Sequence, residues 1–119
     1  LRVLVLGGGV LAAMKRSHPT DWRTNVARGA TAESVEVSED LAELACRAAA
    51  CVGTDMAGVD ILEKTVGLSP TREKEYFVLE VNGVPGWRGL SRVTGVDIAQ
   101  KVMEYGRKRV QLRDSGQAP

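Results

Sequence analysis

The chain has 119 residues, of which 44% are hydrophobic and 26% are charged, and its formal net charge is +1. This length allows at most one domain, and the balanced charge gives no reason to expect nucleic acid or an anionic membrane as a partner. The sequence contains no apolar run long enough for a membrane span and no recognisable secretory signal. Cys46 and Cys51 lack partners at metal-binding spacing, so reduced, largely buried thiols in a cytoplasmic protein are expected.

The pattern of apolar and turn residues predicts short strands combined with two helices. In chain order, the expected elements are strands over residues 1–6, 10–16 and 31–37, a helix over 39–52, antiparallel strands over 56–62 and 76–82, and a final helix after residue 95. Gly7-Gly8-Gly9 is expected to join the first two strands as a hairpin. Ser38 is a good N-cap for the first helix. The order indicates an α+β fold with helices packed on an antiparallel sheet.

The segments between these elements are expected to be loops. Residues 64–75 contain glycine, proline and several charges, which favours a connecting loop. Residues 83–89 form a second loop rich in glycine and proline, and residues 111–119 are expected to fray. The domain is therefore expected to cover residues 1–112, followed by a flexible tail over residues 113–119.

Oxygen-bearing side chains gather at the end of the strand over 76–82. Glu80 and Asn82 share one face of that strand, because side chains alternate with a period of two. Asp60 joins them if the strands over 56–62 and 76–82 pair. Two adjacent carboxylates repel each other, and a bound cation relieves that repulsion. Mg²⁺ prefers such oxygen ligands when phosphates supply the rest, although a solvated acidic patch has the same sequence pattern.

Four arginines form a second candidate set: Arg2, Arg16, Arg23 and Arg28. A guanidinium group matches the oxygen geometry of phosphate or carboxylate, and phosphoryl transfer needs such counter-charge. Each of them could equally be a surface arginine.

The segment Gly7-x-Gly9-x-x-Ala12 offers a competing interpretation, because it imitates the dinucleotide-binding fingerprint. That motif needs a long helix after the glycines. Here Pro19 follows too soon, and no strand ending in an acidic residue comes at the right distance. A nucleotide-cofactor domain of this kind is therefore disfavoured.

Taken together, several segments resemble the C-terminal part of RimK-type ATP-grasp ligases, which include ribosomal-protein glutamate ligase and the LysX group. The likeness covers nearly all of residues 1–105. It is carried by the strand over 1–5, the returning strand that ends in Lys15-Arg16, Asp21-Trp22-Arg23-Thr24-Asn25-Val26-Ala27-Arg28-Gly29, Ala57-Gly58-Val59-Asp60-Ile61-Leu62, Glu80-Val81-Asn82-x-x-Pro85-Gly86 and Thr94-Gly95-Val96-Asp97-Ile98-Ala99.

The resemblance implies an ATP-driven reaction in which a carboxylate becomes an acyl phosphate and an amine then captures it. The expected cofactors are ATP and Mg²⁺ or Mn²⁺, and the expected partners are a carboxylate, an amine that is an amino acid, and further copies of the chain. Asp60, Glu80 and Asn82 would bind the metal and ATP, and Arg23 would contact phosphates. Arg23 and Arg2 are the expected catalytic arginines, and the expected substrate-binding residues are Arg16, Arg28, Asn25 and Gly86.

The chain also departs from the family pattern. The family's N-terminal domain and lid are not in this sequence, so a fragment that is inactive without them is expected. Val84 and Arg88 replace a small hydroxyl residue and an acidic residue in the loop expected to meet substrate, which leaves the substrates open. Trp87 in the same loop could line a substrate pocket. The alternative is a stand-alone module, derived from this domain, that binds or oligomerises without catalysis.

Overall fold

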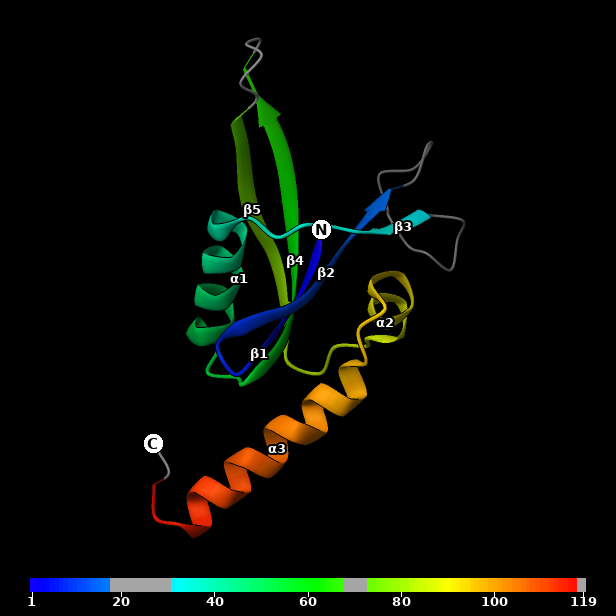
Figure 1. Ribbon diagram of the computed structural model, residues 1–119. Coiled ribbons are helices and arrows are strands. Elements are labelled where there is room, and N and C mark those ends of the chain that lie inside the picture. Colours follow the sequence, from blue (N-terminus) through cyan, green and yellow to red (C-terminus); the bar gives the residue numbers. More distant parts are fainter. Residues whose placement is uncertain (18–30, 68–72, 118–119) are drawn as a thin grey trace.

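The computed structural model describes residues 1–17, 31–67 and 73–117 of the chain (Figure 1). In chain order, its elements are β1 (Arg2–Leu6), β2 (Gly9–Ser17), β3 (Thr31–Ser34), α1 (Glu39–Cys51), β4 (Met56–Val66), β5 (Glu73–Asn82), α2 (Arg88–Thr94) and α3 (Ile98–Asp114). Figure 1 shows the β4–β5 ribbon and helix α3 extending in opposite directions from a central body. None of the helices in these ranges is long and apolar enough to cross a membrane.

The described strands form one antiparallel sheet in the order β3-β2-β1-β4-β5. The predicted hairpin over β1 and β2 is confirmed, and the Gly7–Gly8 turn has positive φ angles of 60° and 82°. This hairpin removes the dinucleotide-binding interpretation, which needs a helix at the same place. The α+β class predicted from the element order is likewise confirmed.

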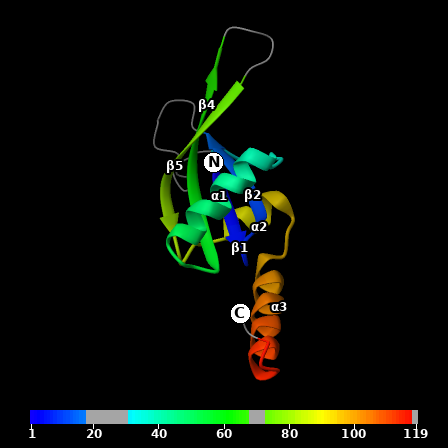
Figure 2. The ribbon, with the colours of Figure 1, turned by 90° about the vertical axis from the view of Figure 1, so that its left-hand side faces the viewer.

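The sheet separates two hydrophobic cores. Helix α1 covers one face of the sheet, as Figure 2 shows, where Leu41, Ala45 and Ala49 pack against the inner residues of β1, β2 and β4. On the other face, Leu90 of α2 and Ile98 of α3 pack against Leu4, Ala12 and Met14. Helix α2 packs over β2 and β3, whereas Tyr105 of α3 lies against Gly7 at the β1–β2 turn.

Ser38 caps α1 as the sequence predicts, because its hydroxyl accepts a hydrogen bond from the Leu41 amide at 3.3 Å. Strand β3 ends at Ser34, three residues before the predicted end at residue 37. Cys46 is half-buried and its burial raises the pKa of its thiol, whereas Cys51 is exposed. The expectation that both thiols are largely buried is therefore wrong for Cys51.

The predicted loop over residues 64–75 was wrong at both ends. Strand β4 runs on to Val66 and β5 begins at Glu73, so the two strands continue as a ribbon. Opposite charges face each other in this ribbon, as in the pair Lys64 and Glu75, and such cross-strand pairs stabilise a ribbon. Gly67 and Pro70 led to the loop prediction, but the strands extend on both sides of residues 67–72.

The C-terminal part of the chain is more helical than predicted. Helix α2 is too short for its periodicity to be recognised, but its Leu90 is fully buried. Helix α3 continues to Asp114, beyond the fraying expected from residue 111, because residues 107–113 are mostly good helix formers. The basic residues Arg107 and Lys108 therefore lie inside the helix, and only Arg113 lies in its last turn.

Candidate functional site

Asp60 and Glu80 lie directly opposite each other on β4 and β5. Directly opposite residues point to the same face of a sheet, so the two carboxylates share a face, as the sequence predicts. One extra residue of β5, Leu79, is inserted beside this pair, since Asp60 pairs with Glu80 whereas Ile61 pairs with Val78. Such an insertion is a β-bulge, which bends the strand and aims its side chains. The acidic pair thus occupies the irregular point of the ribbon.

Arg2 holds the Asp60 carboxylate from the neighbouring strand β1. Its Nε donates to Asp60 Oδ1 at 2.9 Å, and its Nη2 donates to Oδ2 at 2.8 Å. Both side chains are only about one-fifth exposed, at 20% and 19%. The hydrogen bonds from Arg2 to Asp60 raise the pKa of Arg2, and the charge of Glu80 raises it further. This is the two-pronged geometry in which guanidinium and carboxylate bind each other most strongly.

Arg16 reaches the same carboxylate less closely. Its Nη2 lies 3.4 Å from Asp60 Oδ1, and its side chain is 22% exposed. Arg16 follows Met14, the partner of Arg2, by two residues on β2, so it shares the face of Arg2. Burial lowers the pKa of Arg16, as does the like charge of Arg2, while Asp60 opposes both effects. Two arginines and two carboxylates therefore form one cluster on this face.

Asn82 ends the same strand two residues after Glu80. Its Oδ1 accepts a hydrogen bond from the Val84 amide at 2.9 Å, which fixes the start of the following loop. The loop then turns back over β4, where Asn82 pairs with Gly58. A Cβ atom added to Gly58 would lie 2.8 Å from Pro85 Cβ, so the loop rests directly on this glycine. The need for glycine at this position is visible only in the structure.

The loop that follows Asn82 contains two further residues singled out from the sequence. Gly86 is exposed, so its backbone is accessible beside the acidic pair's strand end. Trp87 is half-buried and packs against the core that contains Leu90 and Ile98. Arg23, Asn25 and Arg28 lie outside the described residues.

Two further ionic contacts join the strands on the opposite face of the sheet. Glu63 of β4 accepts from Lys15 Nζ at 3.4 Å and from Lys74 Nζ at 3.0 Å. These hydrogen bonds lower the pKa of Glu63, that of Lys74 most, although burial of the carboxylate acts in the other direction. Glu63 lies three residues after Asp60 on β4, so its side chain points to the opposite face of the sheet. Its ion pairs support the ribbon from that face.

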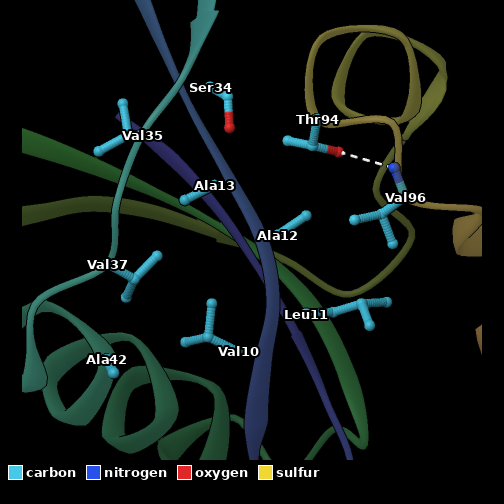
Figure 3. Close-up of a pocket in the computed structure, with 10 residues that line it drawn as sticks. All are labelled: Val10, Leu11, Ala12, Ala13, Ser34, Val35, Val37, Ala42, Thr94 and Val96. Carbon is cyan, nitrogen blue, oxygen red and sulfur yellow. Dashed lines mark hydrogen bonds between the residues drawn. The ribbon is translucent and has the colours of Figure 1, made fainter.

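A groove of about 480 Å³ lies away from this cluster, along β2 (Figure 3). Figure 3 shows its lining side chains, which come from β2, the segment before α1 and the α2–α3 connection, with Thr94 Oγ1 accepting from the Val96 amide at 3.3 Å. The described residues that line this groove carry no ionisable side chain. The candidate chemistry lies instead in the cluster around Asp60.

The donor atoms of the cluster suit a hard cation. No group of three or more His, Cys, Asp and Glu side chains gathers at metal-binding distance within residues 1–17, 31–67 and 73–117. Two carboxylates and an amide oxygen are instead available, from Asp60, Glu80 and Asn82. This oxygen set is incomplete for Mg²⁺ by itself and becomes sufficient when phosphate oxygens and water complete the coordination.

Comparison with known sequences places the chain in a family. A sequence model described as the RimK-like ATP-grasp domain matches residues 1–105, and the chain therefore belongs to the RimK-like ATP-grasp family. A probable alpha-L-glutamate ligase of Aeromonas salmonicida (strain A449) is 41% identical over 106 residues, which are 88% of this chain and 33% of the relative. The tetrahydromethanopterin:alpha-L-glutamate ligase of Methanocaldococcus jannaschii is 39% identical over 104 residues, 87% of this chain and 33% of the relative.

Solved structures agree with this assignment. The ATP-grasp ligase PsnB, in complex with a phosphomimetic variant of its minimal precursor, Mg and ADP, superposes with a TM-score of 0.65 at 26% identity, covering 87% of this chain and 30% of that chain. PsnB with the minimal precursor alone gives a TM-score of 0.63 at 28% identity, with 87% and 33% coverage. The chain thus spans about a third of the length of the relatives that it matches.

Proposed function

We propose that this chain is the Mg–ATP-binding lobe of an ADP-forming carboxylate–amine ligase that acts in the cytoplasm. The observation that carries the proposal is the Asp60–Glu80 pair, held on one face of the sheet with Arg2 and Arg16 beside it. Membership of the ATP-grasp family supports ATP and Mg²⁺ as the ligands of this face. Bound Mg–ATP would supply the phosphoryl group that activates a carboxylate toward an amine.

Within this proposal, each residue of the cluster has a separate task. Asp60 and Glu80 would hold the cation, and Asn82 would add an amide oxygen while its hydrogen bond to Val84 fixes the loop. Arg16 would meet an anionic oxygen of phosphate or of a substrate carboxylate, because its contact with Asp60 is long, at 3.4 Å. Arg23, Asn25, Arg28 and Gly86 remain proposed contacts for phosphate or substrate on the basis of the family resemblance.

The proposed enzyme is longer than this chain, as its relatives are. The chain spans about a third of the curated relatives, so the other wall of the nucleotide cleft would come from residues outside this sequence. We propose that the chain by itself forms no ADP, and that the active enzyme is a homo-oligomer of the longer protein. The relatives are named glutamate ligases, which makes glutamate the first amine to test.

A chimera tests this function directly. The upstream two-thirds of the Aeromonas salmonicida relative is joined to this chain, and ADP formation is measured with panels of carboxylates and amines, glutamate first. We expect ADP only when ATP, a carboxylate and an amine are all present, and none from this chain alone. A folded chimera that forms no ADP with any pair, while the intact relative is active on its own substrates, would instead favour a non-catalytic binding module.

A further inference from the structure

Among the residues that the structure describes, the charged side chains of the candidate site balance without any bound cation. Arg2 and Arg16 carry one positive charge each, and Asp60 and Glu80 one negative charge each, on a single face of the sheet. Adjacent carboxylates ordinarily attract a cation because they repel each other. Here an arginine already occupies both oxygens of Asp60, at 2.9 and 2.8 Å. Arg2 therefore largely neutralises the charge of Asp60, and this weakens the attraction of the site for a free divalent cation.

The geometry of Arg2 suits this task better than binding a ligand. Two of its donors are committed to Asp60, its side chain is 80% covered, and β1 lies between β2 and β4 in the sheet. Because β1 is paired on both sides, Arg2 cannot move far without breaking its hydrogen bonds to Asp60. Each Asp60 oxygen still has a second lone pair, so the carboxylate can ligate a metal while Arg2 keeps its orientation.

We propose that Arg2 is the built-in counter-ion of the Asp60–Glu80 pair, which orients Asp60 and prevents the site from taking up a divalent cation in the absence of a polyphosphate. This inference rests on the proposed function. It assigns Arg2 a positioning role in place of the catalytic role that the family resemblance implied. A cation that arrives with a polyphosphate brings excess negative charge, which compensates Arg2 and Arg16. Free Mg²⁺ brings only positive charge and meets two arginines.

Direct binding of free Mn²⁺ to this chain tests the proposal, measured as loss of the electron paramagnetic resonance signal of the aqueous ion. We expect weak binding by the wild-type chain and at least about tenfold tighter binding by Arg2→Gln, because one charge a few ångströms from a divalent ion outweighs that factor in affinity. Arg2→Lys keeps the charge, so its affinity should stay near wild type. Arg47→Gln removes the same charge from an exposed site on α1 and should change nothing.

The proposal would be overturned by tight binding of free Mn²⁺ to the wild-type chain, or by an unchanged affinity for Mn²⁺ in Arg2→Gln. It would also be overturned by an equal gain in affinity in Arg2→Lys, or by a gain that remains when Asp60→Asn is added to Arg2→Gln. If Arg2→Gln fails to fold, Arg16→Gln carries the test, because it also removes one positive charge and should show a smaller gain.

Parallel titrations of Mn²⁺ with ADP separate this proposal from the proposed function. A gain in Arg2→Gln for free Mn²⁺, without uptake of Mn²⁺–ADP by the wild-type chain or the chimera, would leave the counter-ion role intact and contradict nucleotide binding. Uptake of Mn²⁺–ADP by the wild-type protein, without any gain in Arg2→Gln, would retain nucleotide binding and reject the counter-ion role.

Discussion

At the scale of single residues, the site depends on one glycine as much as on its charges. Asn82 can place its side chain beside Glu80 because the loop after it folds back over Gly58. Pro85 of this loop is buried and lies against Gly58. A side chain at position 58 would occupy the space that Pro85 fills. The proline ring is rigid, so it has no other rotamer that would make room for that side chain. Gly58 thus shapes the end of strand β5, although glycine has no reactive side chain.

The variant Gly58→Ala tests this packing. The new methyl group would lie 2.8 Å from Pro85 Cβ, so we expect the loop to shift and the free energy of unfolding to fall by about 1–3 kcal/mol, as for overpacked cores. Urea unfolding measures the change. The variant Gly86→Ala is the matched control, because its added carbon meets no atom within 4 Å. Equal stability of Gly58→Ala and the wild-type chain would show that the loop yields freely.

The residue scale also shows which part of the site the sequence could predict. The shared face of Asp60 and Glu80 followed from strand periodicity and from pairing of two strands that are neighbours in the chain. The contact between Arg2 and Asp60 did not, because it joins residues 58 positions apart through the placement of β1 in the middle of the sheet. Nothing local in the sequence marks such a pairing. Guanidinium chemistry and the family resemblance both suggested a ligand for Arg2, whereas the structure shows it bound to the carboxylate of Asp60.

At the scale of secondary-structure elements, the β4–β5 ribbon presents the acidic pair. Its length was underestimated because Gly67 and Pro70 are loop-forming residues, whereas the charges that hold the ribbon act across the strands. Glu63 adds support from the far face, since its carboxylate binds Lys15 of β2 and Lys74 of β5. It is only 14% exposed, while the two lysines are about half exposed, so solvent weakens both contacts.

The variant Glu63→Gln should therefore lower stability in a pH-dependent way. The folded state lowers the pKa of Glu63, so its contribution is present above the pKa of the unfolded chain, about 4.3, and disappears as the pH falls through the folded value. We expect a loss of about 1 kcal/mol at neutral pH from two partly exposed ion pairs. In urea unfolding, the difference between variant and wild type should shrink as the pH falls below about 4.3.

The exposed carboxylate of Glu43 provides the control for this measurement, because its pair with Arg47 on α1 is long, at 3.8 Å, and both side chains are more than two-thirds exposed. Glu43→Gln should change stability by no more than a few tenths of a kcal/mol. A Glu63→Gln deficit that stays constant down to low pH would contradict the ionic explanation and indicate lost packing instead.

At the scale of the whole molecule, the two faces of the sheet differ. Helix α1 packs on one face, while α2 and α3 pack on the other, which also carries the arginine–carboxylate cluster. Relatives about three times as long have further residues that could complete a site at this cluster. The family was predictable because its short motifs follow one another in order. The placement of α2 and α3 on the second face is encoded by no single motif.

The central claim is that Asp60 and Glu80 hold the cation of Mg–ATP, and the most direct measurement is ADP formation by the chimera carrying Asp60→Asn or Glu80→Gln. Each variant should lower the rate at least about 100-fold, because the charge that stabilises the transferred phosphoryl group is displaced. Thermal unfolding should change little for Glu80→Gln, and Glu75→Gln, an exposed carboxylate on the same strand, should keep the wild-type rate. Rates for Asp60→Asn and Glu80→Gln that match that of Glu75→Gln would contradict the account.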